Sequence, residues 1–270
     1  MKATVLVDNI AAEDIKSEWG LSFFIEYQGH KILLDAGGSE LFAENAKKLG
    51  LSLAEVEYAA LSHAHYDHGN GMIRFFAEND KAKFHLRRGT GENCYGKRWI
   101  FRKYIGIPRR VMTDYAQRIE LVEGDYPLCP GVTLVPHKTP GLENIGKREA
   151  MYLREGRKWY PDDFRHEQSL VFETERGLVI FNSCSHGGAD NIIKEVQSTF
   201  PGKKIYAIIG GFHLYNKTEE EVLAFARRVQ ECDVEQIYTG HCTGKKAYGL
   251  LQGVLGDKLH QLHSGLVMEF

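Results

Sequence analysis

The feature that most constrains this chain is a run of histidines and an aspartate placed directly after an apolar segment. The run reads His63-Ala64-His65-Tyr66-Asp67-His68-Gly69-Asn70-Gly71, and residues 58–62 before it predict a buried strand. Alternate side chains of an extended segment point the same way, so His63, His65 and Asp67 converge. His68 has the opposite parity and needs a turn to reach the same ion, or it serves a second ion. The run therefore favours two adjacent metal positions over one.

Zinc, iron and manganese all accept imidazole and carboxylate ligands, so the run does not select among these metals. The alternative interpretation is a patch of surface histidines. The location argues against a surface patch, because an apolar predicted strand precedes the run and a surface patch is expected in a polar segment. We therefore expect one or two divalent metal ions, with zinc as the first choice and iron or manganese as alternatives.

The composition predicts a folded protein without membrane-spanning segments. Its 270 residues are 43% hydrophobic and 26% charged, with a net charge of −2, and this mixture excludes disorder. The longest apolar stretches, such as residues 205–209, are far too short to cross a bilayer. The N-terminal segment reaches Asp8 too early for a signal peptide, and the five cysteines form no CxxC pair. We expect a cytoplasmic protein and leave open whether it forms a homo-oligomer.

A basic segment interrupts the otherwise balanced charge. Between positions 81 and 110 there are ten lysines and arginines and one acid, Glu92. Such a segment attracts anions, and aromatic rings beside the cations can stack on a flat ring, so we expect a small anionic substrate. The candidate substrate-binding residues are Arg87, Arg88, Arg98, Trp99, Arg102 and Tyr104. A solvated basic loop is one alternative; nucleic-acid binding ranks low because the basic residues are confined to one segment.

The rest of the chain predicts alternating strands and helices. Residues 21–27 and 31–35 predict a hairpin, and Ser39 begins a helix that Gly50 ends. Residues 87–168 carry most of the prolines and little periodicity, so we interpret them as a long insertion that covers the site. Later strands are expected at residues 169–173, 178–182, 205–209 and 236–239, with helices at 191–199 and 218–231. This order predicts one α/β domain, residues 1–270, whose sheets are sandwiched between helices.

Several segments together resemble the metallo-β-lactamase superfamily. They are the strand with its HxHxDH run, residues 32–37 and residues 238–241. The resemblance extends from near residue 1 to near residue 270 and implies an αββα sandwich with a one- or two-metal site at one sheet edge. Further segments resemble the branch of metal-dependent hydrolases that includes archaeal dihydropterin–ribofuranosylaminobenzene phosphate synthases. These segments are residues 7–9, 18–23, 182–186, 210–214 and 239–244.

The resemblance implies a ligand set. The side chains that match the first metal motif of the superfamily are His63, His65, Asp67 and His68. His241 takes the place of the last metal histidine, and we add His186, at the end of a predicted strand, as a further ligand.

The chain departs from the superfamily pattern between these segments. A lone histidine and then a bridging aspartate are usual there, but His137 lacks the usual neighbours and Cys184-Ser185-His186 stands where the aspartate is expected. Cys184 is either a thiolate ligand or, as we favour from sequence, a buried thiol. His213 follows a strand and two glycines, and it is a ligand, a proton donor or a core histidine. Asp35 is expected to orient a ligand histidine.

A metal held by imidazoles makes hydroxide available near neutral pH. We therefore expect a metal-dependent hydrolase that uses metal-bound hydroxide on a small ester, lactone or phosphoester. Asp67 would orient the hydroxide and His213 would protonate the leaving group. One alternative, implied by the resemblance, is a transferase that condenses a dihydropterin with a phosphorylated ribosyl-aminobenzene. The other is a non-catalytic metal-binding or sensor protein that has kept the fold. The intact ligand run argues against it, because a protein without catalysis has no physical need for those ligands.

Overall fold

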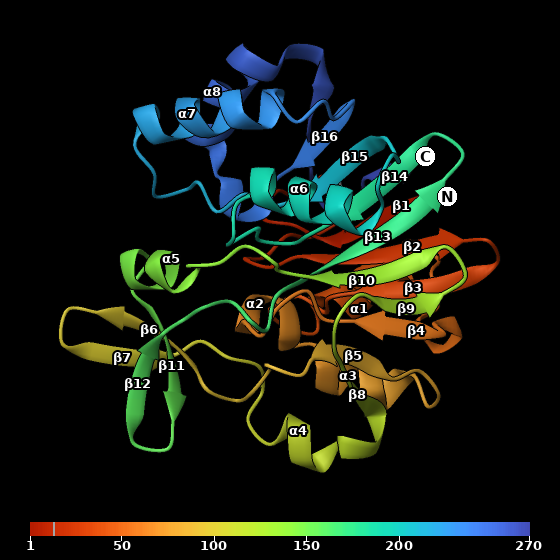
Figure 1. Ribbon diagram of the computed structural model, residues 1–270. Coiled ribbons are helices and arrows are strands. Elements are labelled where there is room, and N and C mark those ends of the chain that lie inside the picture. Colours follow the sequence, from red (N-terminus) through yellow and green to blue (C-terminus); the bar gives the residue numbers. More distant parts are fainter. Residues whose placement is uncertain (13) are drawn as a thin grey trace.

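Two large sheets pack face to face in the computed structural model, which describes residues 1–12 and 14–270 (Figure 1). The first sheet has the order β18-β1-β2-β3-β4-β5-β8 and the second β17-β16-β15-β14-β13-β10-β9. The strands of the first sheet are β1 (Lys2–Val7), β2 (Ser22–Tyr27), β3 (His30–Leu34), β4 (Tyr58–Ala60), β5 (Phe84–Arg87), β8 (Ile119–Val122) and β18 (Val267–Glu269). Those of the second sheet are β9 (Tyr126–Cys129), β10 (Val132–Pro136), β13 (Gln168–Thr174), β14 (Gly177–Phe181), β15 (Ile205–Gly210), β16 (Gln236–Thr239) and β17 (Leu259–Gln261).

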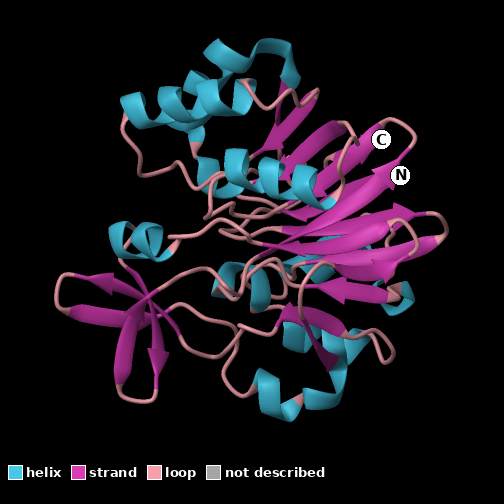
Figure 2. Cartoon of the chain, in the orientation of Figure 1, coloured by secondary structure: helices cyan, strands magenta, loops and turns pink. Residues whose placement is uncertain are grey.

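Helices cover the outer face of each sheet (Figure 2). On the first sheet lie α1 (Leu41–Lys48) and α3 (Met72–Glu78), and on the second lie α6 (Ala189–Thr199), α7 (Glu219–Gln230) and α8 (Lys245–Leu255). The described residues also form the shorter helices α2 (Tyr66–Gly69), α4 (Val111–Asp114) and α5 (Glu143–Arg148), with 3-10 turns at Leu53–Glu55, Ala116–Arg118, His241–Thr243 and Gly256–Lys258. This arrangement confirms the αββα sandwich.

Three apolar layers hold the sandwich together. Alternating side chains of both sheets meet in the middle layer, where the rings of Phe23 and Phe181 lie edge to face with centroids 5.2 Å apart. The outer layers pack α1 and α3 on one sheet and α6, α7 and α8 on the other. Each helix therefore buries one apolar stripe and exposes its polar side.

Local signals indicate the starts of α7, α1 and α6 to within two residues. Thr218 and Glu221 form the capping box at the start of α7. For α1 the N-cap residue is Glu40, one position later than predicted, while the Ser39 hydroxyl accepts a hydrogen bond from the Leu41 N–H. No helix of residues 1–12 and 14–270 combines the length and the apolar character needed to cross a membrane.

The segment 87–168, expected to be one insertion, is divided between three places. Strands β8, β9 and β10 belong to the two large sheets. The rest includes a separate sheet of order β12-β11-β6-β7, formed by β6 (Cys94–Arg98), β7 (Phe101–Tyr104), β11 (Met151–Glu155) and β12 (Lys158–Pro161). In Figure 1 this small sheet stands apart from the sandwich, on the side where α2 and α5 lie.

Candidate metal centre

The candidate site lies where several strands end. His63 and His65 follow β4, while Cys184 and His186 follow β14. His213 and His241 follow β15 and β16 in the same way. Strands β14, β15 and β16 are mutually parallel, so their carboxyl ends meet at one edge of the second sheet. Asp67 and His68 lie on α2, and this short helix supplies the turn that the parity of His68 required.

The first group of possible ligands consists of His63, His65 and His186. One ring nitrogen from each lies within 4.8 Å of the others, and all three residues are buried. The Nε2 atoms of His63 and His65 and both ring nitrogens of His186 have no hydrogen-bond partner. Buried polar atoms are ordinarily paired, so unpaired imidazole nitrogens that converge on one point fit a bound cation.

Hydrogen bonds fix which nitrogen of His63 carries its proton. The Ser62 hydroxyl donates to the Asp35 carboxylate at 2.7 Å, and it therefore accepts from His63 Nδ1 at 2.9 Å. His63 Nε2 then carries a lone pair and no proton. This tautomer is the one that a metal ligand requires.

The second group consists of Asp67, His68 and His241. His68 Nε2 lies 3.2 Å from His241 Nε2, and Asp67 Oδ2 lies 3.5 Å from His241 Nε2 and 3.9 Å from His68 Nε2. His68 Nδ1 donates to Asp35 Oδ2 at 2.8 Å. The Asn9 side-chain oxygen accepts from the Gly20 N–H, so His241 Nδ1 donates to the same oxygen at 3.0 Å.

In their neutral forms these two imidazoles would point lone pairs at each other across 3.2 Å, from His68 Nε2 and His241 Nε2. Such an approach is repulsive unless a cation or a proton lies between the two atoms. The adjacent carboxylate of Asp67 adds a third donor. Imidazole and carboxylate are donors that a divalent transition metal accepts, so this group also fits a metal ion.

Burial sets the protonation states of the first group. Burial, followed by the neighbouring His68, lowers the pKa of His63 well below its usual value. Burial lowers the pKa of His65 to about 3 and that of His186 well below its usual value. These three imidazoles are therefore neutral near pH 7. Burial would raise the pKa of Asp67, but His68 and His241 outweigh it and keep this group ionised.

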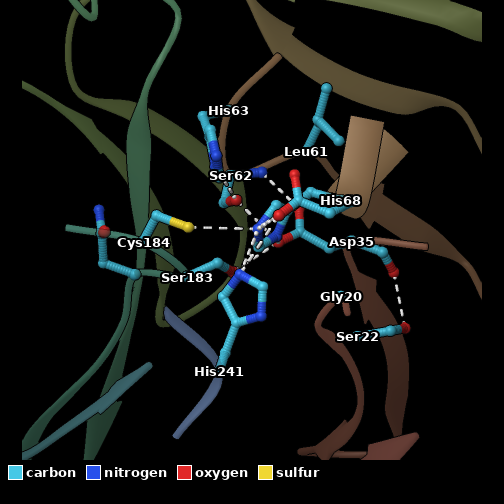
Figure 3. Close-up of polar contacts among 12 residues, drawn as sticks. Gly20, Ser22, Asp35, Leu61, Ser62, His63, His68, Ser183, Cys184 and His241 are labelled. Atoms are coloured by element: carbon cyan, nitrogen blue, oxygen red, sulfur yellow. Dashed lines mark hydrogen bonds and ion pairs between the residues drawn. The ribbon is translucent and has the colours of Figure 1, made fainter. Parts of the chain in front are cut away.

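Asp35 holds the centre together (Figure 3). Its carboxylate accepts hydrogen bonds from the Ser62 N–H, from the Ser62 and Ser183 hydroxyls and from His68 Nδ1. It is fully buried and comes directly after β3. The predicted contact between Asp35 and a site histidine is thus confirmed, and through Ser62 the same carboxylate also orients His63.

Backbone strain accompanies the site. Asp35, Ser185, His213 and His241 all have φ between 44° and 60°, in the left-handed region that few non-glycine residues adopt. Packing and hydrogen bonds must maintain these conformations, and such residues cluster at functional sites.

A cavity of about 350 Å³ opens onto the two groups. His65, Asp67, Cys184, His186 and His213 line it, together with Trp19, Tyr66, Glu149, Tyr215 and Cys242. The small sheet and the residue after it contribute Gly96, Lys97, Arg98, Lys103 and Ile105. A substrate in this cavity would therefore contact basic side chains on one side and the possible metal ligands on the other.

A second cavity of about 560 Å³ shares Glu149, His186 and His213 with the first. His213 has no hydrogen-bond partner on either ring nitrogen, and its Nε2 lies 3.8 Å from the Glu149 carboxylate. Lys217 forms an ion pair with Glu149. His213 and Glu149 thus lie at the junction of the two cavities.

Most of the predicted substrate-binding residues lie elsewhere. Of the six, only Arg98 lines either of these two cavities. Arg87 is buried in β5, where it donates to the Gly124 carbonyl, and Arg88 forms an ion pair with Glu123 on the surface.

The other three lie on the small sheet or its turn. Trp99 is 85% exposed at the tip of the β6–β7 hairpin, and the Arg102 guanidinium stacks on Trp159. The Tyr104 hydroxyl donates to the Ile107 carbonyl. The basic segment is a local motif, and its charge alone could not indicate which side chains face the cavity.

Two of the histidines outside both groups of possible ligands are held by carboxylates. His137 pairs with Glu195 at 3.0 Å and with Glu167 at 3.2 Å. His166 Nδ1 accepts from the Ala64 N–H at 3.1 Å, and its Nε2 donates to Asp162 at 3.1 Å. Both nitrogens of His166 are therefore occupied, and this residue supports the backbone between His63 and His65.

Several contributors carry no recognisable sequence signal. The Trp19 indole N–H donates to Asp67 Oδ2 at 2.9 Å. In the sequence, Trp19 was noted only as part of segment 18–23, which carries the family resemblance. Glu149 stands in no motif at all. The Glu167 carboxylate accepts from the His186 N–H, and Asp8 accepts from the His241 N–H at 2.9 Å.

Known proteins resemble this chain in sequence and in fold. The sequence model of the metallo-beta-lactamase superfamily matches residues 20–194. A 7,8-dihydropterin-6-methyl-4-(beta-D-ribofuranosyl)-aminobenzene-5'-phosphate synthase from Methanocaldococcus jannaschii is 28% identical, and the match covers 94% of this chain and 90% of the relative. The crystal structure of Tm1679, a metal-dependent hydrolase of the beta-lactamase superfamily, has a TM-score of 0.84 and 26% identity, covering 100% of this chain and 99% of that one. A diphosphatase from the PhnP family shares the fold, with a TM-score of 0.57 and 12% identity over 100% and 97% of the two chains.

Proposed function

Because this chain belongs to the metallo-β-lactamase superfamily, we propose that it is a metal-dependent hydrolase of a small anionic ester, lactone or phosphoester. The observation that carries the proposal is the convergence of unpaired imidazole nitrogens beside a cavity with basic side chains. Lys97, Arg98 and Lys103 line that cavity. Their charge would attract an anionic substrate from solution.

His63, His65 and His186 would hold one divalent ion, and Asp67, His68 and His241 would hold a second. Zinc is the first choice, with iron or manganese as alternatives, because all three accept these donors. A bound ion of this kind would polarise a carbonyl or phosphoryl oxygen and supply hydroxide near neutral pH.

The side chains would then handle the protons. The Asp67 carboxylate, held by Trp19, would orient the attacking water and accept its proton as the new bond to carbon or phosphorus forms. The bond to the leaving oxygen breaks, and His213 would supply the proton for that oxygen. The Glu149 carboxylate lies beside this proton donor, 3.8 Å from His213 Nε2.

Turnover of a substrate panel tests the proposal. Metal-loaded protein is expected to hydrolyse at least one member of a panel of esters, lactones and phosphodiesters. The variant His65→Ala is expected to lose that activity by two or more orders of magnitude. His30→Ala is the matched control, since His30 is the first residue of β3 and lies outside both cavities. If no member of the panel is turned over, or if His65→Ala matches wild type, the hydrolase proposal is wrong.

A transferase is the second candidate, favoured by the two cavities that meet at His186 and His213. Two reactants could approach the same centre from different sides. The archaeal relative is named as a synthase, and its product joins a dihydropterin to a phosphorylated ribosyl-aminobenzene. Quenching of tryptophan fluorescence by reduced pterins, followed by product formation with the second reactant, would support this candidate. Stoichiometric metal binding without any turnover would instead favour a sensor protein.

A further inference from the structure

The small sheet has two faces with different surroundings. Opposite residues of antiparallel strands share a face, so the register assigns each side chain to one of them. One face carries Cys94 and Leu153, which are buried in the apolar layer of the first large sheet. The same face carries Gly96, Lys103 and Met151, which line the cavity of about 350 Å³. The other face therefore turns away from both the core and this cavity, on a sheet that stands apart from the sandwich (Figure 1).

Four aromatic side chains lie on this second face, one from each strand of the small sheet. They are Tyr95, Tyr104, Tyr152 and Trp159. In the register Tyr95 lies opposite both Tyr104 and Tyr152, and its ring centroid is 5.3 Å from that of Tyr104 and 4.9 Å from that of Trp159. All four residues are half-buried, so the rings form a continuous row that is partly open to solvent.

Three exposed arginines lie over these rings. The guanidinium carbon of Arg102 is 4.4 Å from the centroid of Trp159, and that of Arg154 is 5.6 Å from the same ring. Arg109 lies 4.1 Å from the centroid of Tyr104. The four rings and these three arginines are called the outer face below. Two guanidinium groups over one ring repel each other, and an anion between them would relieve the repulsion.

No carboxylate of the chain supplies that anion. Arg88, Arg110 and Arg165 each form an ion pair with an acidic side chain, whereas none of the three arginines of the outer face pairs with any acid in residues 1–12 and 14–270. The one acid in the four strands, Glu155, lies opposite Lys158 on the face that lines the cavity. Lys97, opposite Arg102 in the register, adds another cation at the border with the cavity. The outer face is thus positively charged and lacks a negative partner.

We propose that the outer face binds single-stranded nucleic acid. Bases would stack on its rings and guanidinium planes, and its arginines would hold the phosphates. A four-stranded antiparallel sheet with aromatic side chains on its open face can stack two or three bases in this way. A duplex encloses the faces of its bases and cannot use such a surface.

The shape of the surface favours a strand over a single nucleotide. None of the residues of the outer face lines either of the two cavities described above. A mononucleotide on an open sheet face would leave much of its surface in water, whereas a strand reaches several rings and several cations at once.

The fold removes the argument that ranked nucleic acid low. That ranking rested on the confinement of the basic residues to segment 81–110. Strands β11 and β12 bring Tyr152, Arg154 and Trp159 from outside this segment onto the same face. Ring and charge therefore alternate across all four strands, which the local sequence could not show.

Fluorescence anisotropy of short labelled oligonucleotides tests the proposal. Single-stranded RNA and DNA are titrated with protein, beside the corresponding duplex, across a range of salt concentrations and with and without chelator. Wild type is expected to bind the single strands about 10-fold or more tightly than the duplex, and to do so equally in chelator. Trp159→Leu should weaken binding about 10-fold through the loss of one stacked base. Arg102→Gln combined with Arg154→Gln should reduce the slope of log affinity against log salt by about 1.4, because two phosphate contacts are lost.

Lys47→Gln combined with Lys48→Gln, exposed on α1, is the matched loss of two charges and should leave affinity and slope unchanged. Circular dichroism identifies any unfolded variant of the outer face, and the other variant then decides.

The contrary outcomes are distinct from one another. Wild-type affinity in Trp159→Leu, or an unchanged salt slope in the double arginine variant, would overturn the proposal. Binding that disappears in chelator would place the strand at the metal centre and overturn it as well. Absence of nucleic-acid binding together with sedimentation on phosphatidylserine vesicles, lost in Trp99→Ala at the exposed hairpin tip, would identify a membrane surface instead. None of these outcomes bears on the hydrolase proposal, because the outer face lines neither cavity.

Discussion

At the scale of single residues, hydrogen bonds decide which ring nitrogen of each site histidine carries a proton. Asp35 accepts from His68 directly and from His63 through Ser62, and both histidines are thereby left with an unprotonated Nε2. Asn9 accepts from His241 Nδ1 in the same way, so that the Nε2 atom of His241 faces the centre. These partners therefore decide whether the imidazoles can act as ligands, and their substitution should affect metal binding before it affects the fold.

Asp35→Asn should weaken metal binding about 10- to 100-fold. An amide cannot accept all four hydrogen bonds that the carboxylate accepts, and the free energy of unfolding should fall by about 1–3 kcal/mol. Chelator competition and urea unfolding measure the two effects. Asp257→Asn, at an exposed position, is the matched control. Unchanged metal affinity in Asp35→Asn would contradict the role of this carboxylate.

Trp19→Phe should lower kcat/KM about 10- to 100-fold with little change in metal content. The substitution removes one hydrogen bond to an ionised carboxylate, which contributes about 1.5–3 kcal/mol. Trp159→Phe, on the small sheet, is the control for loss of an indole. Equal kinetics in both variants would show that Trp19 does not hold Asp67 during the reaction.

Elements of the fold bring the site together through close backbone contacts. The HxHxDH run continues through Gly71 into α3, and a Cβ at Gly71 would lie 2.1 Å from the Ala36 carbonyl oxygen. The segments after β3 and β4 can approach so closely only because this residue has no side chain.

Gly71→Ala should lower the free energy of unfolding by about 1–3 kcal/mol because the neighbouring backbone has to move. Gly253→Ala in α8 is the matched control, since an added Cβ there meets nothing within 4 Å. That control should raise the free energy by about 0.5–1 kcal/mol through the helix preference for alanine. Urea unfolding of both variants measures the two free energies of unfolding. Equal changes in both variants would contradict the expected clash at Gly71.

The end of β10, α6 and the segment before β13 meet at His137, which pairs with Glu167 and Glu195. Burial lowers the pKa of His137, but Glu167 and Glu195 outweigh it and raise the pKa to about 10. The folded pKa exceeds the unfolded value of 6.5. The stabilising contribution is therefore complete below pH 6.5 and is lost as the pH rises toward 10.

Metal-free wild type should accordingly lose several kcal/mol of unfolding free energy between pH 6.5 and 10, at about 1.4 kcal/mol per unit of pKa difference. His137→Gln should remove most of this slope. Guanidinium unfolding of both proteins in chelator, from pH 6 to pH 10, measures the difference. Parallel pH profiles would mean that His137 carries no charge in the folded protein.

At the scale of the whole molecule, the sandwich supplies the possible ligands and the small sheet supplies one wall of the cavity. Lys97, Arg98 and Lys103 lie on that wall, whereas Trp99 and Ile100 at the hairpin tip are exposed. The sandwich would therefore carry the reactive centre, and the small sheet would attract the substrate.

Lys97→Glu combined with Lys103→Glu should reduce kcat/KM for an anionic substrate by at least 10-fold at low salt, and the dependence on salt should weaken or reverse. Lys47→Glu with Lys48→Glu, exposed on α1, is the matched charge reversal outside the cavity. Steady-state kinetics across ionic strength compare the two variants. Equal losses in both would show that only the overall charge matters.

The sequence predicted those elements whose signals lie in residues close together along the chain. The HxHxDH run, the β2–β3 hairpin and the α7 capping box are local, and their patterns indicated the right elements. The position of His137 depends on Glu167 and Glu195, which lie 30 or more residues away in the chain. Arg87, predicted to bind substrate, lies in a strand that is buried on both faces, and its charge alone did not indicate this place. Only the folded chain shows which distant segments meet.

Because the Nε2 atoms of His68 and His241 face each other, the centre can bind a proton as well as a metal cation. In metal-free protein a hydrogen ion must bridge the gap, and an incoming cation has to displace it. Loading should therefore acidify an unbuffered solution, and apparent affinity should climb as the medium becomes more alkaline. The molecule would then retain its ions in neutral surroundings and release them in acidic ones.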